Sequence, residues 1–224
     1  DAYQPNERDM HITRALIDTL SACEHPLSIS TKSSLVERDI DLLAPMARKN
    51  LAAVYVTVTT LDGDLARRWE PRAAAPWRRL ETIRRLAEAG VSVGVMVAPI
   101  VPFLNEPEIE SVLEQARAAG ARSAHYTVLR LPHELEGIFD DWLQRHFPER
   151  RERILARLRE LHGGALDGPF GARFRGQGPR AELLAQRFAI ARRRVGLDRP
   201  LPPLAVHLFR PPAKHVGEPV QQAL

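Results

Sequence analysis

The sequence predicts an α/β fold in which parallel strands alternate with helices. Two observations carry this prediction. Four short runs rich in apolar and β-branched residues are each followed by a run with apolar residues at helical spacing. Two of the helical runs end at Gly90 and Gly120, as helices commonly do. Strict alternation fits either an open doubly wound sheet or a full or partial (β/α) barrel, and the pattern alone leaves both open.

The first quarter of the chain contributes one strand between two helices. Ile12, Leu16 and Leu20 recur at helical spacing and predict a helix over 7–24, which Pro26 ends. The run LSIST (27–31) follows as a strand. Ser33 or Ser34 can cap the next helix, because Glu37 stands three residues after Ser34, the spacing of a capping box. That helix is expected to continue to about Asn50.

The next part repeats the unit. The run AAVYVTVTT (52–60) is almost continuously apolar or β-branched, which is typical of a strand buried on both faces of a parallel sheet. A long loop follows it. The remaining expected elements are a helix over 77–89, a strand over 91–101, a helix over 106–119 and a strand over 123–131. Pro132 ends the last of these strands.

The alternation stops after residue 133. Helices are expected over 134–146, 149–162 and 180–195, and the run LAVHLF (204–209) predicts a last short strand. The segment 163–179 holds six glycines and two prolines, and it carries Arg173, Phe174 and Arg175. We therefore divide the chain into a partial barrel (1–133), an Arg-rich helical extension (134–198) and a Pro-rich tail (199–224), whose last dozen residues we expect to be disordered.

Composition excludes several classes of protein. The 224 residues hold a single cysteine, Cys23, so the chain cannot build an internal disulfide framework or a cysteine-ligated metal site of its own. No run approaches the ~20 apolar residues that span a bilayer, and no apolar signal segment opens the chain, which predicts a cytoplasmic protein. The sequence contains neither a GxGxxG nor a GxxxxGK[ST] motif, so it predicts neither a Rossmann dinucleotide site nor a P-loop.

Charge divides the chain unevenly. Residues 1–144 hold 16 Lys and Arg against 21 Asp and Glu, whereas residues 145–224 hold 16 against 7. This asymmetry predicts an anionic partner for the C-terminal part, although solvated helix faces would give the same composition. Arginine and phenylalanine in the flexible segment 163–179 are the side chains that single-stranded nucleic acid requires for stacking and phosphate neutralisation.

Polar residues at the carboxyl ends of the strands are the candidate site, because both architectures place their chemistry there. The cations are Lys32 and Arg130 at strand ends and Arg72 on the long loop after the second strand, and together they suit a carboxylate or phosphate. Lys32 is one of only three lysines in a chain with 29 arginines. It fits three roles: a surface lysine, a clamp for an anionic ligand, or a Schiff-base nucleophile in a dry pocket. Thr57 shares a strand face with Thr59. The pair reflects either simple β-propensity or hydroxyls that face a barrel lumen and a ligand.

Several long stretches resemble radical S-adenosylmethionine (SAM) proteins, and most of all the spore-photoproduct-lyase-like group often labelled DNA repair photolyases. The resemblance extends to about residue 198 and is carried by DAYQPNE (1–7), STKSSLVERDIDLL (30–43), VTVTTLDGDLARRWEPRAAAPWRRLETIRRLAEAGV (56–91), GVMVAPIVPFLN (94–105), VLRLPHEL (128–135) and GQGPRAELLAQRF (176–188).

The resemblance implies a partial (β/α)6 barrel of the TIM type, followed by a mostly helical extension. It also implies a [4Fe–4S] cluster held by a CxxxCxxC loop, and SAM that is cleaved reductively to a 5′-deoxyadenosyl radical. This chain has no CxxxCxxC. We therefore expect a truncated or excised chain whose first strands and cluster ligands lie upstream of Asp1, and which alone holds no cluster.

Carried over by the resemblance, Lys32 would pair with the SAM carboxylate, Thr57 would contact its polar groups, and Asp1 would lie near its amino group. Arg72 is a candidate ligand or substrate contact, and the adenine would be bordered by Val97, Ala98, Pro99 and Leu129. The implied partners are SAM and a reductant such as ferredoxin or flavodoxin, with nucleic acid as a candidate substrate through Arg173, Phe174 and Arg175. A hydrogen-donor cysteine has no match, so the catalytic residue, the substrate and the oligomeric state remain open.

Two alternatives to the radical SAM hypothesis remain open at this point. One is a metal-free barrel aldolase or lyase that uses Lys32 as a Schiff-base nucleophile. The other is a non-catalytic nucleic-acid-binding module built on residues 145–196.

Overall fold

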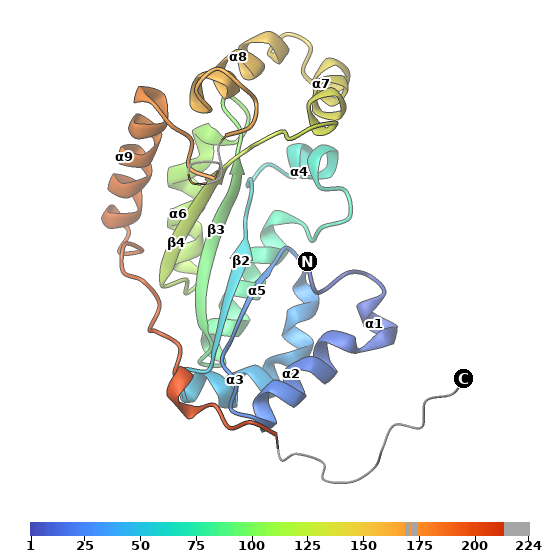
Figure 1. Cartoon of the computed structure of the whole chain (residues 1–224), viewed down its shortest axis with the longest axis vertical. Helices are drawn as coiled ribbons and strands as arrows, with labels where there is room; N and C mark the ends of the chain where they lie inside the picture. Colours follow the sequence, from blue (N-terminus) through green and yellow to red (C-terminus); the bar gives the residue numbers. More distant parts are fainter. Residues whose placement is uncertain (169–170, 172–173, 213–224) are drawn as a thin grey trace, which may run out of the picture.

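A parallel four-stranded sheet organises the chain, as the alternation predicted. The computed structural model describes residues 1–168, 171 and 174–212. The strands are β1 (Leu27–Thr31), β2 (Ala52–Thr57), β3 (Ser92–Ile100) and β4 (Ser123–Val128), which lie in chain order and are all parallel (Figure 1). Since each strand pairs with its neighbours along the chain, the sheet is consistent with part of a (β/α) barrel.

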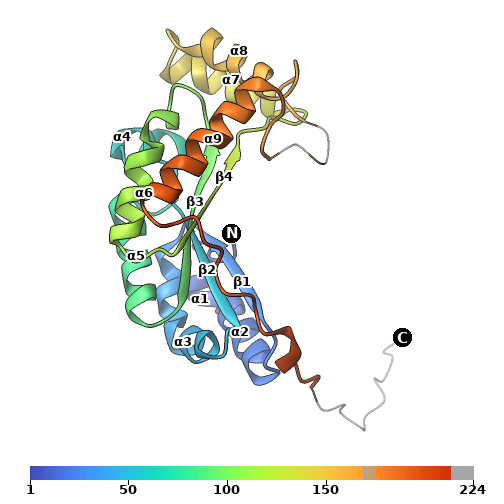
Figure 2. The same cartoon turned by 90° about the vertical axis from the view of Figure 1, so that its left-hand side faces the viewer.

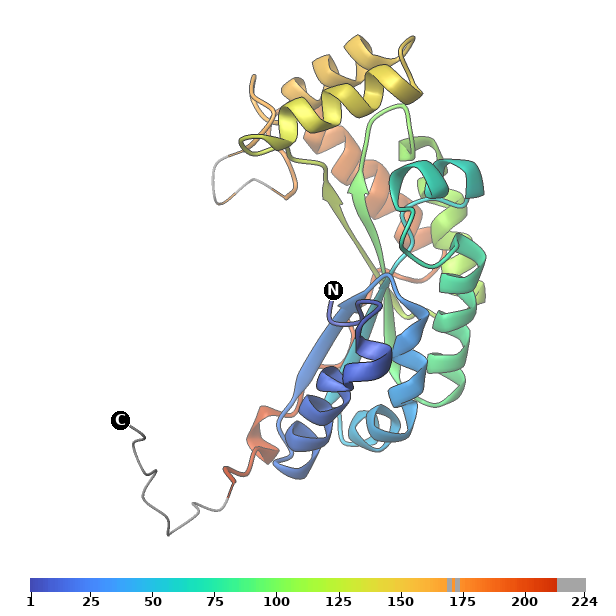
Figure 3. The ribbon, with the colours of Figure 1, turned by 90° about the vertical axis from the view of Figure 1, so that its right-hand side faces the viewer.

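Helices cover one face of this sheet. They are α2 (Ile12–Ala22), α3 (Ile40–Arg48), α5 (Pro76–Glu88) and α6 (Ile109–Ala118), and Figures 2 and 3 show them on the same side. Val54, Val56 and Val95 point into this layer and are fully buried. On the opposite face a Cβ added at Gly94 would meet the ring of Tyr55 at 2.5 Å, so the small residue lets the aromatic ring lie flat against the sheet.

Two expected helices differ in detail from their predictions. The helix expected over 7–24 is broken at His11, whose φ of 54° separates α1 (Glu7–Met10) from α2. The helix expected over 34–50 starts as a 3₁₀ segment, η1 (Ser34–Asp39), whose N-terminus is capped by the Ser33 hydroxyl, before it continues as α3. Ser33 rather than Ser34 is therefore the cap.

The loop expected after β2 contains a further helix. This is α4 (Gly63–Trp69), and its N-terminus is capped by the Asp62 carboxylate, which accepts from the backbone N–H groups of Asp64 and Leu65. A short 3₁₀ turn, η2 (Glu106–Glu108), precedes α6. Helix α4 and turn η2, which begins the helix expected over 106–119, both lie at the carboxyl end of the sheet, so they shape the edge where a ligand would bind.

The C-terminal part is helical, as predicted. It comprises α7 (Leu135–His146), α8 (Arg151–Leu161) and α9 (Pro179–Arg194). Helix α9 packs beside α6 (Figure 2). The ring of Phe188 on α9 lies 4.6 Å from the ring of Tyr126 on β4. Helices α7 and α8 lie beyond the carboxyl ends of the strands (Figure 3).

The strand predicted over 204–209 is wrong. The structure has a 3₁₀ turn there, η3 (Val206–Leu208), because the adjacent prolines remove the donors that a sheet ladder would need. After α9 the chain instead runs back past the amino ends of the strands, where Ala205 donates to the carbonyl of Asn50 and Arg210 to that of Cys23. The predicted disorder of the last dozen residues falls on positions 213–224, outside the described part of the chain.

Candidate functional site

The candidate site begins where β1 ends. The Asp1 carboxylate accepts hydrogen bonds from the Thr31 hydroxyl at 2.8 Å, from the Lys32 backbone N–H at 2.8 Å and from the Tyr3 backbone N–H at 2.9 Å. The Thr31 hydroxyl in turn accepts from the backbone N–H of Ser33. The chain start is therefore joined to the strand end that carries Lys32, which brings two of the predicted site residues together.

The Lys32 side chain extends to a carboxylate that the sequence did not single out. Its Nζ lies 3.6 Å from Oε1 of Glu70, and the two side chains are 35% and 11% exposed. The same oxygen accepts a hydrogen bond from the Thr59 hydroxyl at 3.0 Å. Glu70 stands in the irregular loop after α4, where no periodicity marks it as inward-facing, so only the structure reveals its role.

A buried arginine holds Glu70. Arg79, at the start of α5, is 2% exposed and donates from Nη2 to Glu70 Oε2 at 2.6 Å. Its Nε donates to the carbonyl of Ala74 at 2.7 Å, and its Nη1 to the carbonyl of Thr57 at 3.1 Å. One guanidinium thus joins the end of β2, the loop after α4 and the carboxylate that contacts Lys32, with nearly all of its donors directed to acceptors.

A cavity of about 710 Å³ opens beside Lys32. Three separate segments form its walls: the chain start, the β1–η1 junction and the loop before α5. The residues that line it are Asp1, Tyr3, Gln4, Pro5, Arg8, Lys32, Ser33, Ser34, Leu35, Arg38, Arg72, Ala73, Ala74 and Arg78. The predicted residues Asp1, Lys32 and Arg72 therefore border one space, and that space is rich in cations.

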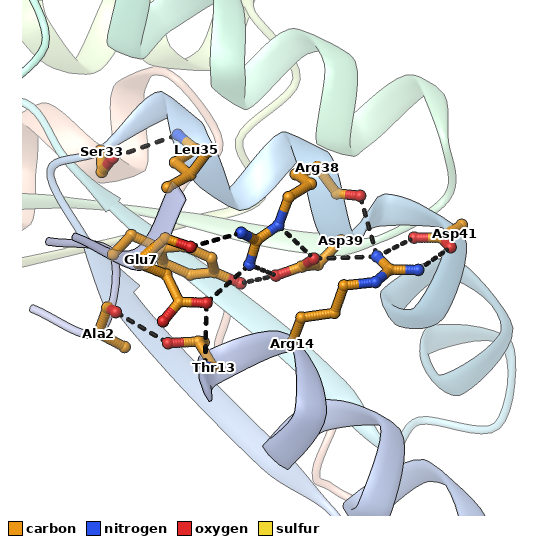
Figure 4. A network of polar contacts seen from close by, with 10 residues as sticks. Ala2, Glu7, Thr13, Arg14, Ser33, Leu35, Arg38, Asp39 and Asp41 are labelled. Carbon is orange, nitrogen blue, oxygen red and sulfur yellow. Dashed lines mark hydrogen bonds and ion pairs between the residues drawn. The ribbon is translucent and has the colours of Figure 1, made fainter. Parts of the chain in front are cut away.

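A network of ion pairs fixes the wall formed by the chain start (Figure 4). Arg38 donates to the Glu7 carboxylate at 2.8 Å and to the fully buried carboxylate of Asp39 at 3.0 Å. Asp39 also accepts from Arg14 and from the Tyr3 hydroxyl, both at 3.0 Å. Burial, followed by the Asp39 charge, raises the pKa of Tyr3, so this phenol stays protonated and keeps donating.

The charge state of Glu7 follows from the same network. Burial alone would raise the pKa of Glu7, but hydrogen bonds from the Arg38 side chain and the Thr13 backbone outweigh that effect and lower the pKa to about 2. Glu7 is therefore ionised at neutral pH, and it ties α1 to both η1 and α2.

The other predicted contacts for SAM lie outside this cavity. Thr57 is buried, and its carbonyl accepts from Arg79. Val97 is fully buried on the face that the helices cover, so only its backbone is available to a ligand on the other face. Ala98 and Pro99 lie near the carboxyl end of β3, where Asn105 donates to the Pro99 carbonyl at 3.0 Å. Leu129 directly follows β4, and its carbonyl lies 2.8 Å from Nε2 of His162.

The predicted nucleic-acid contacts are only partly described. Arg173 lies outside the residues that the structure describes. Phe174 and Arg175 are exposed, and the Phe174 ring lies 5.5 Å from the guanidinium of Arg130. Its backbone carbonyl accepts from Val128, which attaches the segment to the outer edge of β4.

The residues present do not fit an iron–sulfur cluster. Within the described ranges, no group of three or more His, Cys, Asp or Glu could hold a metal ion. The one cysteine of the sequence, Cys23, is half-buried just after α2, near the amino end of β1 and away from Lys32. A cluster needs several thiolates, so this chain does not supply its ligands.

The helices were also compared with the requirements for a membrane span. Across the described segments, no helix reaches the length and apolarity that crossing a bilayer demands.

Comparison with known proteins gives uncharacterized relatives. The chain is 34% identical over 208 residues to an uncharacterized protein of Mycobacterium tuberculosis, a match that covers 91% of this chain and 58% of that protein. It is 29% identical over 154 residues to an uncharacterized protein of Methanocaldococcus jannaschii, covering 69% of this chain and 56% of the other. The chain thus spans somewhat more than half the length of these curated relatives.

A family model gives the class. The model described as the radical SAM superfamily matches residues 3–116, the region that contains β1 to β3 and most of the cavity walls. The match covers just over half of the 224 residues. The chain therefore belongs to the radical SAM superfamily.

Proposed function

We propose that this chain is the SAM-binding part of a radical SAM enzyme, most similar to the spore-photoproduct-lyase-like group. The observation that supports the proposal is the position of Lys32. It lies at the carboxyl end of β1, inside the family match, beside a cavity of about 710 Å³ and close to Asp1. A compact ammonium in that place suits the carboxylate of a bound amino acid moiety.

The proposed roles follow the edge of the sheet. The Lys32 ammonium binds the SAM carboxylate, and its contact with Glu70 holds it in place for that ligand. Asp1 lies near the amino group, and Thr57 offers polar contacts from the end of β2. The adenine lies against the ends of β3 and β4, where backbone and apolar surface are supplied by Val97, Ala98, Pro99 and Leu129.

The cluster is not assigned to this chain. Members of the superfamily normally use SAM together with a [4Fe–4S] cluster, but the residues described here hold no ligand set for one. Because the relatives are considerably longer than this chain, we propose that the cluster ligands belong to a part of the protein outside residues 1–224. A small electron carrier such as ferredoxin or flavodoxin would then serve as the reductant.

The test uses the full-length protein, reconstituted anaerobically with iron and sulfide. The proposal predicts the visible absorbance of a [4Fe–4S] cluster and the reductive cleavage of SAM after addition of dithionite. Lys32→Gln should weaken SAM binding. A reconstituted protein with neither signal would refute the assignment, and an unchanged SAM affinity in the variant would refute the role of Lys32.

A second candidate function is nucleic-acid binding by the C-terminal part. The exposed Phe174 and Arg175, together with Arg130, form the combination of ring and cation that single strands use. A gel shift with single-stranded oligonucleotides over increasing salt tests it, because phosphate contacts weaken as salt rises. Absence of a shift at low salt would remove this candidate, and the DNA-lyase-like substrate with it.

The Schiff-base alternative receives less support. A nucleophilic lysine requires a dry pocket that favours the neutral amine. Lys32 instead lies 3.6 Å from the Glu70 carboxylate and is about one-third exposed, which is an ion-pairing environment. Borohydride trapping with carbonyl compounds would detect an adduct if the alternative held.

A further inference from the structure

We propose that the cavity beside Lys32 binds a small molecule carrying a phosphate or carboxylate group, and that Arg8 and Arg72 are the residues that hold this group. The proposal goes beyond the SAM-binding function, since it concerns a second ligand and two different cations. Both arginines line the cavity: Arg8 in the wall formed by the chain start and Arg72 in the wall formed by the loop before α5.

The carboxylates in the cavity lining and directly behind its walls all accept hydrogen bonds from protein donors. Asp1 is the only acidic residue in the lining, and its carboxylate already accepts three kinds of donor from Thr31, Lys32 and Tyr3. Behind the walls, each neighbouring carboxylate is bound by at least one arginine, which applies to Glu7, Glu37, Asp39 and Glu70. The lining and the walls behind it therefore hold no unpaired carboxylate, and Asp9, the exposed residue that follows Arg8 on α1, does not line the cavity.

Three of the lining cations are likewise occupied. Arg38 is bound to Glu7 and Asp39, and Arg78 donates with both terminal nitrogens to Glu37 at 2.5 and 2.8 Å. Lys32 contacts Glu70 at 3.6 Å and is the cation assigned above to the SAM carboxylate, so it is not counted for a second anion.

Arg8 and Arg72 differ from these three. Both are exposed, and neither guanidinium makes a hydrogen bond or ion pair with any described residue. Two unneutralised guanidinium groups therefore border a space that lacks an available acid. An anionic ligand would complete the charge balance.

The two arginines are also carried on fixed backbone, unlike arginines at random surface positions. Arg8 belongs to α1, which the buried ion pair between Glu7 and Arg38 fastens to η1 (Figure 4). Arg72 lies in the loop between Glu70 and Ala74, and Arg79 binds both of those residues. The buried ion pairs on either side of the cavity thus hold the two guanidinium-bearing segments, and preorganised segments lose less freedom when a ligand binds.

The size and lining of the cavity indicate the class of ligand. A volume of about 710 Å³ falls within the usual range for small-molecule sites. The planar fork of arginine matches phosphate and carboxylate in a bidentate manner. Single-stranded nucleic acid would need accessible rings for stacking, but the one aromatic residue in the lining, Tyr3, is 3% exposed and its hydroxyl is bound to Asp39.

Isothermal titration of the full-length protein, without SAM and before any cluster is reconstituted, with pyrophosphate and, separately, with citrate at low ionic strength tests the proposal. At least one of the two should bind, and the tighter of the two tells whether the site prefers phosphate or carboxylate. Arg72→Gln and Arg8→Gln should each weaken that binding about tenfold or more, the loss expected for a charge-assisted contact. Arg122→Gln is the matched control, because Arg122 is also exposed and without a side-chain partner among the described residues but lies at the amino end of β4. The affinity of this variant for the probe should differ from that of the unchanged protein by less than about twofold.

Three results would overturn the proposal. The first is that the unchanged chain binds neither probe. The second is that Arg122→Gln weakens binding as much as Arg72→Gln, which would indicate unspecific attraction to a basic protein. The third is that a single-stranded oligonucleotide competes with the probe and binds more tightly in an Arg72-dependent manner, which would assign the cavity to nucleic acid. None of these measurements involves SAM or a cluster, so this proposal and the proposed function can fail separately.

Discussion

Replacement of Arg79 by methionine should strongly destabilise the fold. Arg79 is 2% exposed and donates hydrogen bonds to Glu70, Ala74 and Thr57 at 2.6 to 3.1 Å. Methionine fills a similar volume but removes the Arg79 donors from the carbonyls of Ala74 and Thr57 and from the Glu70 carboxylate, whose remaining partners are Thr59 and Lys32. Loss of one partner of a buried ion pair costs about 3–5 kcal/mol, so we expect a decrease of about that size in the free energy of unfolding. Urea denaturation followed by circular dichroism measures it, with the m-value unchanged if the transition stays two-state.

The same helix supplies a control, and a second substitution tests the reasoning. Arg84 of α5 is about half exposed and pairs with Glu81, so Arg84→Met should cost less than about 1 kcal/mol. Removing Glu70 as well should recover part of the loss, because the double variant Arg79→Met with Glu70→Met no longer leaves a carboxylate without its main partner. An Arg79→Met variant within about 1 kcal/mol of the unchanged protein, or a double variant that is less stable than Arg79→Met alone, would refute the assignment of Arg79 as the anchor of this edge.

Three further predictions concern Glu7, Glu70 and Gly94. The folded-state pKa of Glu7 is depressed to about 2, so the stability that Glu7 contributes is present above the unfolded-state pKa of 4.5 and is lost as pH falls toward 2. Glu7→Gln should therefore flatten the curve of unfolding free energy against pH in this range, and an unchanged slope would contradict the prediction. Glu70→Gln should weaken the binding of SAM to the full-length protein but leave methylthioadenosine, which lacks the carboxylate, unaffected; equal losses for both ligands in equilibrium dialysis would indicate general damage instead of a role through Lys32. Gly94→Ala should destabilise the sheet by about 1–3 kcal/mol in urea denaturation, because the added Cβ would meet Tyr55 at 2.5 Å and Ser123 at 2.7 Å; a neutral result would show that the Tyr55 ring moves aside at no cost.

The strands could be predicted from sequence because their signal is local. Each strand is a short run of apolar and β-branched residues bounded by glycine, proline or polar residues, and all four occur within three residues of their expected ends. The break at His11 could not be predicted, since residues 7–12 contain no glycine or proline that would mark the end of a helix. The break depends on a tertiary contact, because the carboxylate of Glu7 accepts the backbone N–H of Thr13 as well as the Arg38 guanidinium.

The site was predictable only in part, for a related reason. Lys32 could be identified because it directly follows a strand, and Arg72 because it lies on the long loop after the next strand; strand ends gather at one edge of a parallel sheet. Glu70 and Arg79 could not, because an acidic loop residue and one arginine among many on a helix normally face solvent. Arg79 faces inward because the loop after α4 presents the Ala74 carbonyl and the Glu70 carboxylate to it and the end of β2 presents the Thr57 carbonyl, an arrangement that no spacing of residues encodes.

The two buried ion networks explain more about position than about stability. Taking an arginine and a carboxylate out of water costs several kcal/mol, and a well-packed apolar pair is often at least as stable. Yet the described chain places one such network on each side of the same cavity: Arg38 with Glu7 and Asp39 beneath α1, and Arg79 with Glu70 beneath the loop that carries Arg72. Apolar packing would tolerate small shifts of either segment, whereas directional hydrogen bonds to charged groups fix both the distance and the angle at which each segment meets the sheet. The networks therefore account for how three segments distant in sequence can hold Arg8, Lys32 and Arg72 around one cavity.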